Sequence, residues 1–166
     1  MTDKALYILA GYDDETEKYL AGIQKKLYEQ GFTGVHTKNI PQHITMGSFP
    51  AEMENELTAL LKKLSEEETA FEVTFNHVGI FGGGKVLFIA PDANEQMLRF
   101  KERFGSSDNW TPHTTMLIDT PDMTLKAIPV VLSEFSSFRG RITTLYLYEF
   151  WPTRHILTVK LTAAEG

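Results

Sequence analysis

Cysteine is absent from the 166-residue chain, which excludes disulfides, thiolate nucleophiles and cysteine-ligated zinc. The absence fits a reducing compartment such as the cytoplasm. The sequence also lacks an apolar run of the ~18 residues that a membrane-spanning helix needs. Its first residues lack the charged and apolar regions of a signal peptide. We therefore expect a cytoplasmic protein without a membrane anchor.

Positive charge is scarce. The 16 Lys and Arg are outnumbered by 22 Asp and Glu, which gives a net charge of −6. A protein that wraps a long nucleic acid usually carries a basic surface, so an extended duplex is not an expected partner. A small phosphate ester or an RNA terminus is a more suitable partner for a chain with this negative net charge.

Linkers and low-complexity segments are also missing, and the length suits a single domain over residues 1–166, which we expect to be a monomer. Apolar runs and alternation predict strands at 4–11, 34–38, 43–49, 71–81, 85–91, 113–118, 141–150 and 155–161. Helical spacing predicts a first helix that begins after Asp13 and Asp14 and has an apolar stripe of Leu20, Ile23, Leu27 and Tyr28. It predicts three further helices, at 52–66, 93–104 and 122–134. Pro129 predicts a kink or a late start in the last of these.

The most informative feature is a phrase that occurs twice, 70 residues apart. Residues 41–50 read PQHITMGSFP and residues 111–120 read TPHTTMLIDT, so His-x-Thr-Met is present in both. The similarity extends to the strands KALYILA and KVLFIAP. It indicates an internal duplication, although two strand–helix units can also resemble each other by chance. We expect an α+β, bilobal fold in which two antiparallel sheets flank a central groove with helices outside. The lobes would cover about 1–80 and 85–166, with strands that can swap between them.

The repeated phrase has a direct chemical interpretation. Residues two apart in a strand face the same side, so His43 lies beside Thr45, and His113 lies beside Thr115. Two imidazoles can divide the work of a general acid and a general base. Threonine hydroxyls can donate hydrogen bonds to phosphate oxygens, on which transition-state charge accumulates. A symmetric pair of lobes would place these groups on opposite sides of one phosphorus atom.

Other interpretations compete with this one. A histidine in a strand is often only structural, but none of the other three histidines has a threonine two positions later. Two histidines could also ligate zinc or iron, yet no third ligand stands at a suitable spacing. A binding module that holds a nucleotide or RNA end without turning it over is the main non-enzymatic alternative.

Aromatic residues near the motifs are candidates for contact with a nucleobase. Phe81 precedes the turn Gly82-Gly83-Gly84, and Trp110 lies three residues before the second motif histidine. Phe49 and Trp151 are further candidates. Packing in the core is the competing role for each of them.

At the two motifs the sequence resembles the two-histidine (2H) phosphoesterase superfamily, in particular its 2′-5′ RNA ligase-like branch. Methionine follows each threonine where leucine is more usual in that superfamily. The resemblance implies a phosphoesterase that needs no metal or cofactor and acts on 2′,3′-cyclic phosphates or 2′-5′ linked nucleotides and RNA ends. It also implies that His43 and His113 are the acid–base pair and that Thr45 and Thr115 hold the phosphate. Separately from the resemblance, the positions of Phe81 and Trp110 make them the aromatic residues that we expect to contact the substrate.

Overall fold

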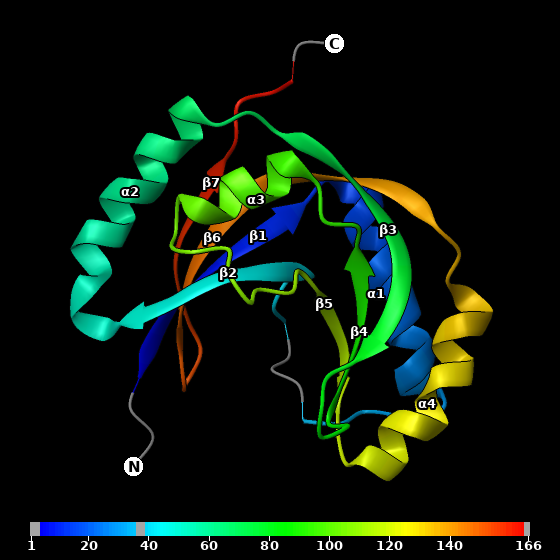
Figure 1. Ribbon diagram of the computed structural model, residues 1–166. Coiled ribbons are helices and arrows are strands. Elements are labelled where there is room, and N and C mark those ends of the chain that lie inside the picture. Colours follow the sequence, from blue (N-terminus) through cyan, green and yellow to red (C-terminus); the bar gives the residue numbers. More distant parts are fainter. Residues whose placement is uncertain (1–3, 36–38, 165–166) are drawn as a thin grey trace.

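A computed structural model describes residues 4–35 and 39–164 of the chain (Figure 1). The short strand expected at 34–38 falls mainly on residues outside this part, and Gly34 and Val35 form a turn. No helix formed by the described residues is both long and apolar enough to cross a bilayer.

The chain alternates strands and helices in the predicted order. The strands are β1 (Ala5–Tyr12), β2 (His43–Pro50), β3 (Phe71–Ile80), β4 (Val86–Pro91), β5 (Thr114–Ile118), β6 (Phe138–Phe150) and β7 (Arg154–Lys160). The helices are α1 (Asp14–Glu29), the 3-10 turn η1 (Ala51–Met53), α2 (Glu54–Glu67), α3 (Glu95–Glu102) and α4 (Pro121–Glu134).

All seven strands pair antiparallel, which confirms the predicted α+β architecture, but they form one continuous sheet rather than two. The order is β2-β1-β6-β3-β4-β5, and β7 pairs with β6. The long strand β6 joins the two halves, since Phe138–Ile142 pair with β3 and Ile142–Phe150 pair with β1. The 13 residues of β6 are enough to serve both halves, and this is why the expected pair of sheets is fused.

The sheet curves until the two ends of the strand path meet, as Figure 1 shows near its centre, where β2 approaches β5. Helix α1 packs against α4 and contacts both β1 and β5, while α2 packs against β6 and β7 on the other side. One apolar core runs through both halves. Contact between β2 and β5 matters because each of these strands carries one copy of the repeated motif.

Local signals account for the helices. Asp13 caps α1 by accepting a hydrogen bond from the Thr16 backbone N–H at 3.3 Å. Leu20, Ile23 and Leu27 are buried as expected, whereas Tyr28 is 38% exposed and lies outside the buried stripe. Helix α4 begins at Pro121 and continues through Pro129, so the late start is not observed.

The motif strands alternate as predicted. On β2, Ile44 and Met46 are buried in the core, while His43 and Thr45 are only half-buried. The second copy repeats this pattern: Thr114 and Met116 are buried, and His113 and Thr115 are half-buried. The His and Thr side chains of both motifs therefore lie outside the fully buried core.

Candidate functional site

The two histidines of the motifs make the same hydrogen bond. His43 Nδ1 lies 2.7 Å from the carbonyl oxygen of Pro41, and His113 Nδ1 lies 2.9 Å from that of Thr111. A carbonyl can only accept, so Nδ1 carries the proton in both rings. Each neutral imidazole consequently presents an unprotonated Nε2, and the bond fixes the orientation of the ring.

Burial lowers the pKa of both His43 and His113 below the ordinary value, and the hydrogen bond to the carbonyl offsets part of this effect. The charge of a protonated His113 lowers the pKa of His43 further, because two neighbouring positive charges repel each other. Both rings therefore favour the neutral form more strongly than a free imidazole does.

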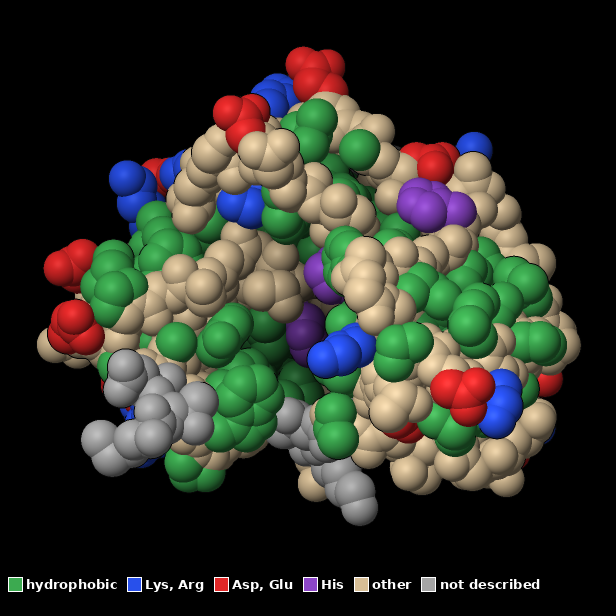
Figure 2. All heavy atoms as spheres, turned by 60° about the horizontal axis from the view of Figure 1, so that its bottom comes forward, with side chains coloured by type: hydrophobic (Ala, Val, Ile, Leu, Met, Phe, Trp, Pro, Cys, Tyr) green, Lys and Arg blue, Asp and Glu red, His purple; other side chains and the backbone are tan. Residues whose placement is uncertain are grey.

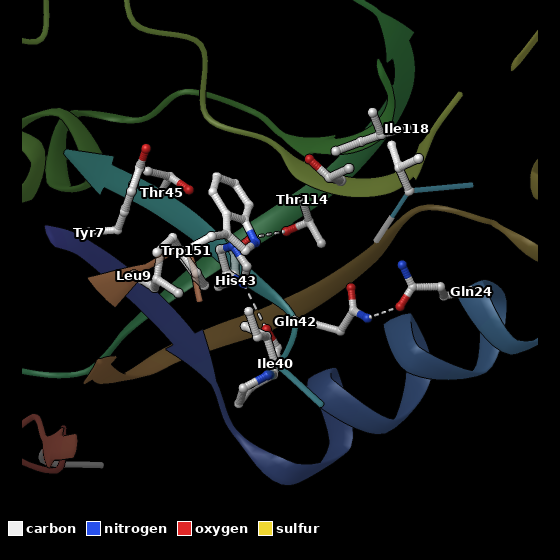
Figure 3. A pocket seen from close by; sticks show the side chains of 14 residues that line it. Tyr7, Leu9, Gln24, Ile40, Gln42, His43, Thr45, Thr114, Ile118 and Trp151 are labelled. Atoms are coloured by element: carbon white, nitrogen blue, oxygen red, sulfur yellow. Dashed lines mark hydrogen bonds between the residues drawn. The ribbon is translucent and has the colours of Figure 1, made fainter. Parts of the chain in front are cut away.

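Two adjoining hollows surround these side chains, and Thr45 and Tyr7 line both of them, so they form one groove. The first hollow includes His43 and Trp151, which are labelled in Figure 3. Thr115 also lines it. The second includes His113. Figure 2 shows two histidine side chains at the bottom of a hollow bordered by hydrophobic side chains. All four polar residues of the two motifs thus reach one groove.

A buried chain of hydrogen bonds joins the two motif strands. The Thr114 hydroxyl donates to the carbonyl oxygen of His43 at 3.0 Å, and Tyr12 Oη lies 2.5 Å from Thr114 Oγ1. Thr114 has a single proton, which it gives to His43, so the Tyr12 hydroxyl donates to Thr114. Burial raises the pKa of Tyr12, which keeps this donor protonated. This chain holds the start of β2 against the start of β5.

Replacing Thr114 by Val should lower the free energy of unfolding by about 1–3 kcal/mol, because it leaves the buried Tyr12 hydroxyl without an acceptor. The side chains of Tyr12 and Thr114 are 4% and 1% exposed, so water cannot substitute. Chemical unfolding of Thr114→Val, Tyr12→Phe and the double variant measures the effect. The double variant should cost less than the sum of the single changes; strict additivity would contradict this coupling.

Phe81 and Trp110 have different positions relative to the groove. The Phe81 ring makes an edge-to-face contact with the His113 ring, with 4.7 Å between the ring centroids. Phe81 itself lines neither hollow. Trp110 lines the second hollow, and its Nε1 donates to the carbonyl oxygen of Thr45 at 3.3 Å. Phe49 lines neither hollow and packs on the core, whereas Trp151 lines the first.

Sequence analysis missed Lys101, Tyr12 and Thr114. Lys101 lies between Arg99 and Glu102 in a helical segment with several charged residues, a context typical of solvent-exposed surface. In the structure Lys101 is buried, its Nζ donates to the carbonyl oxygen of Ser106 at 2.9 Å, and it lines the second hollow. Tyr12 and Thr114 are 102 residues apart, so no local pattern indicates their contact. The sequence around Lys101 likewise gives no sign that its Nζ donates to the carbonyl oxygen of Ser106.

Within residues 4–35 and 39–164, no three His, Cys, Asp or Glu side chains gather in a way that could hold a metal ion. The expectation of metal-free chemistry stays a prediction.

Several solved structures share the fold. The crystal structure of Escherichia coli LigT in apo form is 16% identical with a TM-score of 0.62, and the match covers 98% of this chain and 99% of that one. TT0787 of Thermus thermophilus is 16% identical with a TM-score of 0.65, over 97% and 100% of the two chains. LigT complexed with 3′-AMP is 15% identical with a TM-score of 0.63, over 97% and 99%.

By sequence, the chain matches no curated protein. The family model of the 2′-5′ RNA ligase superfamily, in contrast, matches residues 13–151, a span that contains both motifs and five of the seven strands in full. The two His-x-Thr motifs in one groove agree with that match, and the chain belongs to the 2′-5′ RNA ligase superfamily of 2H phosphoesterases.

Proposed function

We propose that the protein is a metal-independent phosphoesterase that opens 2′,3′-cyclic phosphates or cleaves 2′-5′ linkages in nucleotides or at RNA ends. One observation carries the proposal: two histidines with the same hydrogen bond from Nδ1 to a backbone carbonyl line adjoining hollows, both of which Thr45 lines and one of which Thr115 lines. The structure of LigT with 3′-AMP, a nucleotide with a terminal phosphate, is consistent with it.

In the proposed reaction, the neutral Nε2 of one histidine takes a proton from water as the water oxygen bonds to phosphorus. The bond from phosphorus to the ribose 2′ or 3′ oxygen breaks, and the protonated second histidine gives its proton to that oxygen. Thr45 and Thr115 donate hydrogen bonds to the non-bridging oxygens, which gain charge in the transition state. Proton exchange with solvent then restores the pair. The assignment of acid and base to His43 and His113 depends on how the substrate lies.

The proposal is tested by incubating the purified protein with the four 2′,3′-cyclic mononucleotides and a 2′-5′ linked dinucleotide, in the presence of a chelator. We expect ring opening to a single phosphomonoester, either 2′ or 3′, identified by chromatography. Failure to convert any member of the panel would contradict the proposal. Binding of a cyclic nucleotide that stays intact would instead support the binding module.

The dependence of kcat/KM on pH should show a maximum on the acid side of neutrality. Catalysis needs one neutral and one protonated imidazole, and kcat/KM reports the groups of the free enzyme. Since burial lowers the pKa of both rings below the ordinary 6.5, the singly protonated pair is most abundant below that pH. The rate should fall as the pH rises through neutrality, because the acid loses its proton. A profile from about pH 4 to 9 measures this, and a maximum on the alkaline side would contradict it.

A further inference from the structure

The second hollow contains a buried cation whose bonding is incomplete. Lys101, on α3, is only 7% exposed, although lysine is rarely buried without a partner. Its Nζ donates to the carbonyl oxygen of Ser106 at 2.9 Å and lies 5.7 Å from the centre of the Trp110 ring. An ammonium group has three N–H donors, so one carbonyl and one aromatic face leave it short of acceptors.

The charge of Lys101 has no carboxylate partner in the part of the chain that the structure describes. Among the residues that the structure describes, none lies within ion-pair distance of Nζ, although exposed Asp108 also lines the hollow. Burying an unpaired charge is costly, so an anion that entered the hollow would relieve this cost. Burial lowers the pKa of Lys101, and a bound anion would restore the preference for the charged form.

The hollow connects Lys101 to the two motifs. Thr45 and His113 line one part of it, and Trp110 bridges toward Lys101, with its Nε1 on the carbonyl oxygen of Thr45 at 3.3 Å and its ring under the ammonium. Ser48, Ser106 and Asn109 add polar lining. A ligand whose phosphate sits between the motifs can therefore extend along Trp110 and place a second anionic group at Lys101.

We propose that Lys101 binds a second, non-reacting phosphate of the substrate, which makes the substrate a 2′,3′-cyclic nucleotide that carries another phosphate group. This inference rests on the proposed function. The second phosphate would be either a 5′-phosphate on the same nucleoside or the internucleotide phosphate of an oligonucleotide end, since both present the same chemistry. Substrates without it leave the ammonium unpaired, as it is in the free protein, and so they lack the gain in binding free energy that the second phosphate supplies.

The test compares adenosine 2′,3′-cyclic phosphate, its 5′-phosphorylated form, and a dinucleotide that ends in the same cyclic phosphate. For the wild-type protein, kcat/KM should be higher by about tenfold or more with a second phosphate, as expected for a charge-assisted hydrogen bond. Comparison of the 5′-phosphorylated nucleotide with the dinucleotide shows whether the second phosphate is a 5′-phosphate or an internucleotide phosphate.

Lys101→Met, which keeps the apolar stem, should abolish the higher kcat/KM of the substrates with a second phosphate and change turnover of the singly phosphorylated substrate little. Lys101→Arg should retain the advantage. Lys62→Met, at an exposed position of α2, is the matched control.

Two outcomes would overturn the proposal: equal kcat/KM of the wild-type protein for substrates with and without the second phosphate, or an equal loss for both in Lys101→Met. The second outcome would mean that Lys101 acts on the reacting phosphate or on the fold. If Lys101→Met does not fold, judged by its unfolding transition, Lys101→Gln replaces it.

A binding measurement separates this inference from the proposed function. Adenosine 3′,5′-bisphosphate should bind the wild-type protein more tightly than adenosine 3′-monophosphate, and the difference should disappear in Lys101→Met. Calorimetry detects this preference even if no substrate is turned over. Absence of turnover with the preference intact would contradict only the phosphoesterase, and absence of the preference would overturn the role of Lys101.

Discussion

Replacement of His43 or His113 by Asn should lower kcat for ring opening of a 2′,3′-cyclic nucleotide by about 10²–10⁴-fold. Asn can still donate to the carbonyl oxygen that each Nδ1 contacts, at Pro41 and Thr111 respectively, so the local backbone keeps its partner. What the change removes is the Nε2 that moves the proton in the proposed reaction. Because the proposed reaction uses the two histidines as a unit, the double variant should be little worse than either single variant.

The control for both changes is His77→Asn. His77 is an exposed histidine on β3 whose Nδ1 lies 3.9 Å from Asp92 Oδ1, and it does not line the groove. Its variant should retain the activity of the wild-type protein. Single-turnover rates at saturating substrate, together with unfolding curves for each variant, measure the effect on chemistry separately from the effect on folding. Full activity in both motif variants would refute paired-histidine catalysis.

Thr45→Val should reduce kcat by about 10²-fold, a loss typical of removing one donor to a developing oxyanion. Thr45 lines both hollows, so its hydroxyl is available to a phosphate that lies between the two histidines. Val has nearly the same shape, and the backbone carbonyl of Thr45 that accepts from Trp110 is unchanged. The loss should therefore arise from the missing hydroxyl alone.

Thr45→Ser distinguishes the hydroxyl from the methyl group, since it should restore most of the activity lost in Thr45→Val. Thr74→Val, at an exposed position of β3, is the control for an exchange of Thr for Val within a strand. The ratio of kcat values is the decisive measurement. A change in KM with constant kcat would mean that Thr45 only binds the ground state of the substrate.

Much of the local structure is readable from the chain, because hydrophobic periodicity and capping residues act over short distances. Asp13 marks the start of α1, and the alternation around His43 and His113 correctly separates groove side chains from core side chains. The length and pairing of β6 were not predictable in the same way. Its division between β1 and β3 depends on two strands more than 50 residues apart in the sequence, and no local pattern encodes such a choice.

The candidate site likewise has features that the sequence predicts and features that only the tertiary structure shows. The sequence by itself determined which residues are the candidates for the chemistry, since His-x-Thr occurs twice and strand alternation places the His and Thr of each motif on one face. Only the tertiary structure decided that the two copies share a groove, because the curved sheet brings β2 against β5 and the hydrogen bond from Thr114 to His43 holds them there. The tertiary structure also decided where Phe81 and Lys101 lie, which the side-chain type alone does not predict. Phe81 contacts His113, and Lys101, in a charged segment, is buried beside the groove, because burial depends on which distant segments pack together.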